Sequence, residues 1–264
     1  MASSRSTREK AAQARAEQLA AEDRSRRRRI VGGAALVLLL IVAIGVAVLL
    51  GRPKADDTAL ALPAPNPAAA LPKGVLGPDS PTPYAVPAGD APASAKTVQV
   101  WEDFQCPFCA TFEAAQGADV TALAASGDVR VVYRIATFLD DKFPQSRLSS
   151  ARAANAWGAA IDAGKGDEFR ALVFANQPKD EGVGFTDEQL VELGRQAGIT
   201  GADLDAFATK VAEHTYFGWV ANSSEAFRAS AVPSTPNVIV DGQEVPSQYL
   251  QSGLVDYIRS TTGG

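Results

Sequence analysis

The sequence predicts an α/β domain that follows an N-terminal region of different composition. Residues 97–104 are rich in β-branched and aromatic side chains, which is typical of a strand, and they run directly into a cysteine pair. Residues 108–126 then place apolar side chains at helical spacing, and Gly127 is suited to end this helix. A second strand is expected over residues 129–135.

The rest of the domain is predicted to be a helical block, a hairpin and a last helix. The helical insertion should occupy about residues 146–230. Within it, Thr186 and Gln189 have the spacing of a capping box, and Gly198 is suited to end the helix that they begin. Residues 237–245 predict a hairpin and residues 249–259 an amphipathic helix, so the domain is expected to span residues 96–264.

Three segments of distinct composition precede this domain. Residues 1–29 carry nine Lys or Arg and four Asp or Glu, which predicts a basic cytoplasmic tail. Residues 30–51 are uncharged and apolar, and as a helix of about 1.5 Å per residue they would span about 33 Å, enough for one transmembrane crossing. The excess of basic residues before this run predicts a cytoplasmic N-terminus and a domain outside the cytoplasm. Residues 52–95 hold ten of the sixteen prolines and predict a semi-rigid linker.

Alternatives exist for the N-terminal segments. A cleaved signal peptide could end near Ala59-Leu60-Ala61, but the apolar run and the 29 residues before it are long for one, which favours an uncleaved anchor. The basic tail could bind RNA or anionic lipid, but a role in membrane topology is the favoured explanation of its charge. Residues 96–264 carry 13 basic and 22 acidic residues, which argues against nucleic-acid binding by the domain.

The only two cysteines, Cys106 and Cys109, form a Cys-x-x-Cys motif where the first strand meets its helix. Residues three apart on a helix have Cβ atoms about 5–6 Å apart, so a small adjustment allows a disulfide. Cys106 at the helix start faces unpaired N–H groups and the positive end of the helix dipole, which stabilise a thiolate. Pro107 suits the first helical position, whereas Cys109 is expected to be more buried and to stay protonated. The motif therefore predicts a redox-active pair.

Two other interpretations of the cysteine pair are weaker. A structural disulfide across four residues would contribute about 2 kcal/mol, against about 4.7 kcal/mol for a loop of 100 residues. A zinc site needs four ligands, and the single histidine, His214, lies more than a hundred residues away. We therefore expect no metal and no bound cofactor, and we expect His214 to be a surface or packing residue.

Three segments resemble the DsbA-like branch of the thioredoxin superfamily, a group of thiol–disulfide oxidoreductases. They are EDFQCPFC at residues 102–109, FRALVFANQ at residues 169–177 and STPNVIVDG at residues 234–242. The resemblance covers about residues 96–260 and implies a thioredoxin-like fold with a helical insertion, in a membrane-anchored bacterial member of the family.

The resemblance also implies roles for residues around the cysteines. Pro236 is expected to be a cis-proline that faces them, and Thr235 is expected to offer backbone groups to the substrate. Relatives often carry a carboxylate at the position where this chain has Val100. Glu102 lies on the same strand face and could take over the role of that carboxylate in proton transfer. Alternatively, Glu102 could be a solvated charge at the end of the strand. Phe108 stands where strongly oxidising members have histidine, so the pair is expected to be less oxidising.

The expected function is thiol–disulfide exchange outside the cytoplasm. In the expected direction the enzyme oxidises cysteine thiols of exported proteins, and the resemblance implies a quinone-linked membrane oxidase as the partner that restores the disulfide. One rival is a membrane-tethered reductase, for example in cytochrome maturation. Another is a substrate-binding or chaperone-like domain in which the disulfide is only structural.

Overall fold

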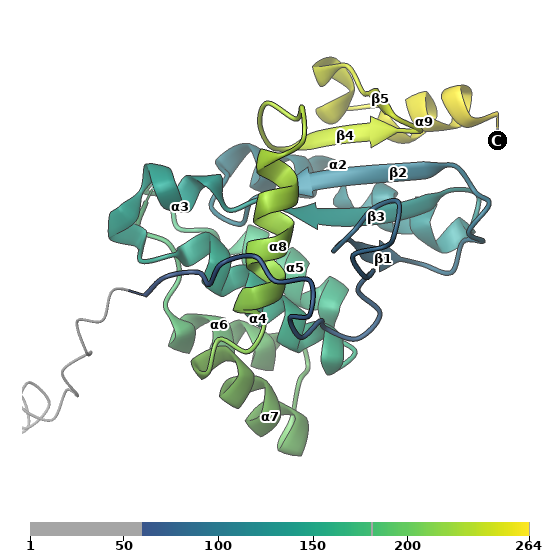
Figure 1. Cartoon of the computed structure of the whole chain (residues 1–264). Coiled ribbons are helices and arrows are strands. Elements are labelled where there is room, and N and C mark those ends of the chain that lie inside the picture. The colour runs from purple at the N-terminus through teal and green to yellow at the C-terminus, as the bar shows by residue number, and fades with distance from the viewer. Residues whose placement is uncertain (1–59, 181, 264) are drawn as a thin grey trace, which may run out of the picture. The chain divides into compact units, whose positions relative to one another are not determined.

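The computed structural model describes residues 60–180 and 182–263, and these fold around a five-stranded sheet (Figure 1). The strand order is β1-β3-β2-β4-β5. In chain order the strands are Val86–Ala88, Thr97–Glu102, Arg130–Ile135, Asn237–Val240 and Gln243–Glu244. Strands β2 and β3 are parallel and every other neighbouring pair is antiparallel. Because a parallel pair needs a crossover connection, helix α2 (Pro107–Ser126) joins β2 to β3.

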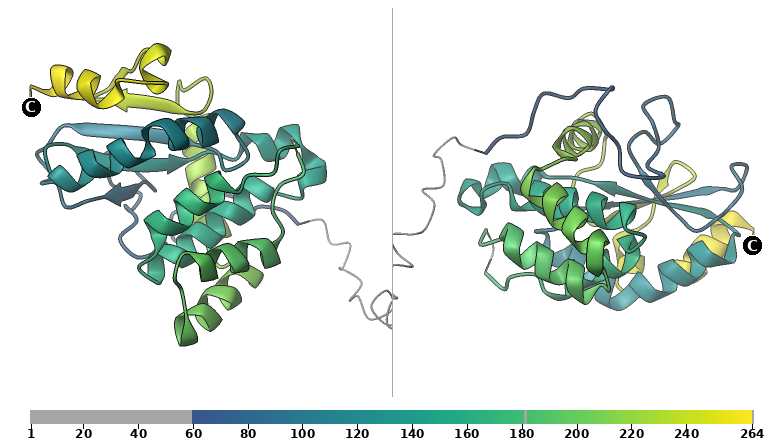
Figure 2. Two further views of the ribbon diagram at one scale, coloured as in Figure 1. Left: turned by 180° about the vertical axis from the view of Figure 1, so that it is seen from behind. Right: turned by 90° about the horizontal axis from the view of Figure 1, so that it is seen from below.

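Helices cover both faces of the sheet. Helices α2 and α9 (Leu254–Thr262) lie together on one face, behind the sheet in Figure 1 and in front of it in the reversed view of Figure 2. Helix α8 (Phe217–Arg228) crosses the other face, where the Ser223 hydroxyl donates to the carbonyl oxygen of Ile135 in β3 at 2.8 Å. Strand β2 is therefore covered on both sides, and Val98, Val100 and Trp101 are at most 1% exposed.

The helical insertion lies between β3 and β4. Its helices are α3 (Phe138–Lys142), α4 (Ser149–Asp162), α5 (Gly166–Ala175), α6 (Asp187–Gln196), α7 (Gly201–Ala212) and α8, with a 3-10 turn at Pro144–Ser146; a second such turn, Ser247–Leu250, precedes α9. Helix α6 begins with the predicted capping box. The Thr186 hydroxyl accepts from the N–H of Gln189 at 3.2 Å, and the Gln189 side chain accepts from the N–H of Thr186 at 2.8 Å.

The core of the insertion is continuous with the loop that carries the cysteines. Trp157 of α4 is fully buried, and its ring lies 5.9 Å from that of Phe104 and 6.0 Å from that of Trp219. Phe104 lies two residues before Cys106 and is itself fully buried. Burial of large aromatic side chains is among the strongest stabilising contributions in a domain, so the insertion fixes the position of this loop.

The prediction that residues 52–95 form a linker, with the domain starting at residue 96, is wrong for residues 60–95. Strand β1 lies in this segment and pairs with β3, and the leucines at 60, 62 and 71 pack against the core. The Asn222 side chain bonds to both the N–H and the carbonyl oxygen of Asn66, each at 2.7 Å. A Cβ atom added at Gly218 would lie 2.6 Å from Ala69, so the segment approaches α8 closely.

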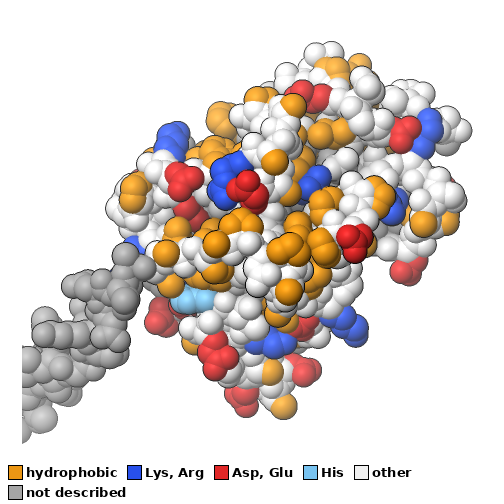
Figure 3. Space-filling model, viewed as in Figure 1, with side chains coloured by type: hydrophobic (Ala, Val, Ile, Leu, Met, Phe, Trp, Pro, Cys, Tyr) orange, Lys and Arg blue, Asp and Glu red, His pale blue; other side chains and the backbone are white. Residues whose placement is uncertain are grey.

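The error has a physical cause. Few large apolar residues separate the prolines, and they follow neither helical nor strand periodicity, so composition predicts an exposed chain. An extended segment can nevertheless bury isolated side chains against a surface that other elements have already formed. Figure 3 shows hydrophobic side chains gathered along the course that this segment takes in Figure 1.

The other N-terminal predictions fall outside the described residues. These are the basic tail (1–29), the transmembrane helix (30–51) and residues 52–59 of the linker. Within the part of the chain that the structure describes, no helix has the length and apolar character needed to cross a bilayer.

Candidate active site

The end of β2 delivers both cysteines to the N-terminus of α2. Cys106 is the N-cap, with φ −75° and ψ 116°, and Pro107 occupies the first turn, where a missing N–H is harmless. Cys106 is 5% exposed and Cys109 fully buried, and both are free thiols. Phe108 between them is 72% exposed. Of the two sulfur-bearing residues, Cys106 is thus the one that reaches the surface.

The two cysteines have opposite pKa shifts. The hydrogen bond from the Cys109 thiol lowers the pKa of Cys106 to about 6, helped by the N–H groups of Cys109 and Phe108, although partial burial opposes the shift. Burial raises the pKa of Cys109 well above its ordinary value, and its hydrogen bond to Cys106 adds to this. At neutral pH the site therefore holds a thiolate on Cys106 and a thiol on Cys109.

The predicted cis-proline lies beside this thiolate. The Thr235-Pro236 peptide bond is cis, as the family resemblance predicted, and it directly precedes β4. The Cys106 sulfur lies 3.3 Å from the carbonyl oxygen of Thr235. Residues 129 positions apart in the sequence are therefore in contact, and the backbone of Thr235 lies next to the sulfur that reacts.

Glu102 is buried and paired, so the alternative of a solvated strand-end charge is wrong. Its carboxylate is fully buried and accepts two hydrogen bonds from Arg170 of α5, Nε to Oε2 at 2.8 Å and Nη2 to Oε1 at 2.5 Å. Arg170 also contacts Glu113 of α2 at 2.8 Å and lies 3.9 Å above the ring of Tyr133. Burial raises the pKa of Glu102 while Arg170 opposes the shift, and the charge of Glu102 contributes to the raised pKa of Cys109.

A second buried polar cluster supports the loop before Cys106. The carboxylate of Asp103 accepts from the N–H of Gln105 at 2.9 Å and from the Ser150 hydroxyl at 2.6 Å. The Gln105 side chain donates to Asp140 at 2.8 Å, and Asp140 also accepts the N–H groups of Ser150 and Ala151 at the start of α4. Burial raises the pKa of Asp103 to about 7 and that of Asp140 to about 6.

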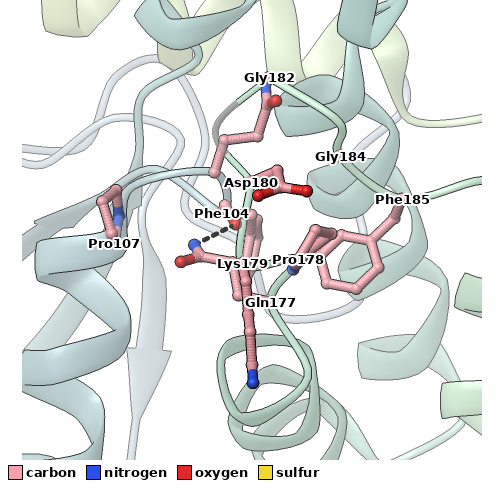
Figure 4. A pocket seen from close by; sticks show the side chains of 10 residues that line it. Phe104, Pro107, Gln177, Pro178, Lys179, Asp180, Gly182, Gly184 and Phe185 are labelled. Carbon is pink, nitrogen blue, oxygen red and sulfur yellow. Dashed lines mark hydrogen bonds between the residues drawn. The ribbon is translucent and has the colours of Figure 1, made fainter.

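Gln177 links the insertion to the cysteine loop directly. Its Nε2 donates to the carbonyl oxygen of Phe104 at 2.8 Å, the bond drawn in Figure 4, and to that of Cys106 at 3.1 Å. No motif or pattern in the sequence predicted a role for Gln177, Arg170 or Asp140. Gln177 and Arg170 lie in segment 169–177, one of the three that carry the family resemblance, and this resemblance could have indicated a role for them. Nothing in the sequence distinguishes Asp140 from a surface carboxylate.

His214 lies away from the cysteines, in the helical insertion. Its ring stacks on Phe217 with centroids 4.4 Å apart, and its Nε2 lies 3.3 Å from Asp187. Among the described residues, no cluster of three or more His, Cys, Asp or Glu side chains is arranged to hold a metal ion.

A site that holds one cysteine as a thiolate at a helix N-terminus and keeps the second as a buried thiol is suited to thiol–disulfide exchange. The class of protein that this fold and site define is the thiol–disulfide oxidoreductases. The family model described as thioredoxin matches residues 83–259, and the chain belongs to this family.

Several solved structures are similar to this chain. MdbA, a thiol–disulfide oxidoreductase from Actinomyces oris, is 22% identical with a TM-score of 0.58, and the match covers 76% of this chain and all of that one. DsbA from Mycobacterium tuberculosis is 27% identical with a TM-score of 0.55, covering 68% and 93%. DsbG from the same organism is 28% identical with a TM-score of 0.54, covering 68% and 88%. Within the thioredoxin family, the chain is thus similar to DsbA-type thiol–disulfide oxidoreductases. No curated protein matches it significantly.

Proposed function

We propose that this enzyme oxidises cysteine thiols of exported proteins outside the cytoplasm. The observation that carries the proposal is the asymmetry of the two cysteines: Cys106 is the N-cap of α2 and has a pKa lowered to about 6, whereas Cys109 is fully buried and has a raised pKa. A stable thiolate on Cys106 favours the reduced form of the enzyme, and an enzyme whose reduced form is stabilised tends to oxidise its substrates.

The reaction consists of two exchanges. In the oxidised enzyme, a substrate thiolate attacks the sulfur of Cys106; the Cys106–Cys109 bond breaks, and Cys109 leaves and takes up a proton because its pKa is high. A second substrate thiolate then attacks the substrate sulfur of the mixed disulfide, and Cys106 leaves as a thiolate. The substrate loses two electrons to the cysteine pair. A leaving thiol with a pKa of about 6 departs readily at neutral pH.

The neighbouring residues have distinct proposed roles. Thr235 and Pro236 would position an extended substrate chain beside Cys106, because their backbone directly precedes β4 and borders the sulfur. Glu102 would act on Cys109 through its charge, since both of its carboxylate oxygens are already bonded to Arg170. Phe108 places an uncharged, exposed ring beside the thiolate.

The reduction potential of the purified protein tests the direction of electron flow. We expect a value above about −200 mV, in the range of proteins that oxidise thiols. A value near −270 mV, as in thioredoxin, would overturn the proposal in favour of the reductase. One observation favours that second candidate: Phe108 is uncharged, so it adds no positive charge that would stabilise the Cys106 thiolate further.

A substitution tests whether the chain is catalytic at all. Cys106→Ser removes the attacked sulfur and is expected to abolish oxidation of a dithiol peptide. If this variant supported oxidative folding of exported proteins as well as the parent does, the protein would act as a binding module with a structural disulfide.

The proposed location rests on the sequence of residues 1–51. The uncharged run 30–51, preceded by nine basic residues, supports a single-pass anchor with a cytoplasmic N-terminus and the catalytic domain outside. In intact cells, a membrane-impermeant thiol reagent should then label Cys106.

Reoxidation by a quinone-linked membrane oxidase is proposed from the family resemblance. Blocking quinone reduction should leave Cys106 reduced in cells, and an unchanged redox state of Cys106 would exclude such a partner.

A further inference from the structure

Gln177 follows the end of helix α5 and lies against the loop that leads to the cysteines (Figure 4). The chain turns after α5, where the N–H of Gln177 donates to the carbonyl oxygen of Phe174 at 3.3 Å. The ring of Phe174 stacks on that of Phe104, with centroids 5.0 Å apart. Because Phe104 is fully buried, this packing holds the two segments together and brings the Gln177 side chain to the loop.

The side-chain amide of Gln177 binds two carbonyl groups of the loop at once. Its Nε2 carries two hydrogens, and it donates to the carbonyl oxygen of Phe104 at 2.8 Å and to that of Cys106 at 3.1 Å. In the described part of the chain, Nε2 is the one hydrogen-bond donor to the Phe104 carbonyl. A buried carbonyl without a donor is costly, so Gln177 determines how this stretch of backbone is oriented.

The backbone of Cys106 is held on both sides. Its N–H donates to the carbonyl oxygen of Asp103 at 2.9 Å. Its carbonyl oxygen accepts from the N–H groups of Cys109 at 3.0 Å and Ala110 at 3.2 Å, in addition to Gln177. The other partners lie within four residues of Cys106 along the chain. Among the described residues, Gln177 is therefore the one distant side chain that fixes this backbone by hydrogen bonding.

The orientation of this backbone controls the surroundings of the sulfur. Cys106 is the N-cap of α2, and the N–H groups of Phe108 and Cys109 in the first turn contribute to its low pKa of about 6. These groups stabilise the thiolate only while they point towards the sulfur. The carbonyl that Gln177 binds belongs to the residue that begins this turn. A change in its orientation would move the sulfur relative to the N–H donors.

We propose that Gln177 is a positioning residue for thiol–disulfide exchange, which fixes the backbone of Cys106 so that the sulfur stays against the first turn of α2. Gln177 acts through the two carbonyl groups and not on the sulfur itself. The inference rests on the proposed function only in taking Cys106 as the reacting thiol, and it holds for either direction of electron flow. It assigns to the helical insertion a residue that sets how strongly the cysteine pair oxidises.

Two measurements on the full-length protein test this role. Gln177→Met keeps the length of the side chain but removes both hydrogen-bond donors. In the reduced variant, we expect the midpoint of Cys106 alkylation against pH to rise by about one unit, which is a tenfold weaker stabilisation of the thiolate. At pH 8, where most of Cys106 is ionised in both proteins, the reduction potential should fall by about 30 mV, the same tenfold change in a two-electron couple.

A matched control separates positioning from general stability. Asn155 of α4 has the same chemistry elsewhere, because its Nδ2 donates to the carbonyl oxygens of Lys210 at 3.1 Å and Val211 at 3.4 Å. Asn155→Leu should lower the temperature of unfolding and leave the alkylation midpoint and the potential as in the parent. If Gln177→Met has no cooperative unfolding transition, Gln177→Asn decides by the same two measurements, since its shorter side chain keeps an amide but cannot bond both carbonyls.

The outcomes separate this inference from the proposed function. An alkylation midpoint and a potential that do not change in the Gln177 variant would overturn the inference and leave the proposed function standing. Shifts of equal size in Asn155→Leu would also overturn it, because destabilisation alone would then explain them. A parent potential near −270 mV would instead contradict the proposed direction of electron flow, and the difference between parent and variant would still test Gln177.

Discussion

Arg170 and Glu102, 68 residues apart in the sequence, form a buried ion pair with two hydrogen bonds. The Nη2 atom of Arg170, which donates one of these bonds, also donates to Glu113. The pair joins α5 of the insertion to β2, the strand that leads into the cysteine motif. A buried carboxylate without a partner is costly, so this contact makes the insertion and the redox site energetically dependent on each other.

Removal of Arg170 should therefore destabilise the protein strongly. Arg170→Met leaves Glu102 buried without its partner, and we expect the free energy of unfolding to fall by about 3–5 kcal/mol in denaturant titrations. The double variant Arg170→Met with Glu102→Gln should recover part of this loss. Arg195→Met, which breaks an exposed pair, serves as the control and should leave the midpoint nearly unchanged. Equal losses in the two arginine variants would contradict the role of the buried pair.

The reactivity of Cys106 should depend on pH with a midpoint of about 6. The rate of alkylation follows the thiolate fraction, so it should rise through this pH and level off above it. Cys109→Ala removes the side-chain hydrogen bond that contributes most to the low pKa of Cys106, and the midpoint should move towards the ordinary thiol value. Alkylation rates of the reduced proteins between pH 4 and 10 measure the midpoint in the parent and in the variant. A midpoint near 8.5 in the parent protein would show that the site does not stabilise the thiolate.

The buried acids Asp103 and Asp140 should make the oxidised protein less stable as the pH rises from about 4 to about 7. Burial raises both pKa values above the ordinary value for aspartate, so the folded state binds protons that the unfolded state has already released in this range. Their stabilising contribution is complete below pH 4 and is lost as the pH passes through about 6 and 7. The oxidised form is used because its cysteines do not titrate.

The readout is the slope of unfolding free energy against pH, not its absolute value. Asp103→Asn removes one of the two titrating groups and should flatten this slope, even though the substitution also disturbs the hydrogen bonds with Gln105 and Ser150. Asp241→Asn changes an exposed turn carboxylate and should leave the slope as it is. A slope that is the same in the parent and in Asp103→Asn would show that Asp103 does not titrate in this range.

The N-terminal segment 60–95 should be required for a stable domain. A chain that begins at residue 96 lacks β1, which pairs with β3, and exposes the surface of α8 that the segment covers. We expect this chain to lose its cooperative unfolding transition, whereas a chain that begins at residue 60 should keep it. Asn222→Ala removes both hydrogen bonds to Asn66 and should cost about 1–3 kcal/mol. Equal thermal stability of the two truncated chains would restore the interpretation of the segment as a free linker.

Several parts of this protein could be predicted from the sequence because their causes are local. The capping box of Thr186 and Gln189 depends on residues three apart, and the helix after Cys106 depends on spacing within twenty residues. The character of the cysteine pair follows in the same way, because the end of a strand and the start of a helix place Cys106 among unpaired N–H groups whatever the rest of the chain does. The cis bond at Pro236 followed from resemblance, not from the residues alone.

Other features were decided only by the tertiary structure. The partners of Glu102, Asp103 and Asn66 lie 68, 47 and 156 positions away, and a sequence pattern cannot show which distant side chain will face a buried polar group. For this reason the sequence left open whether Glu102 is a solvated charge, whereas in the fold it is a buried ion-pair partner; its role in proton transfer stays a prediction. The order of residues 60–95 also depends on distant parts of the chain. Their composition alone predicts an exposed linker, whereas the free energy that orders them comes from packing against a surface formed by the rest of the domain.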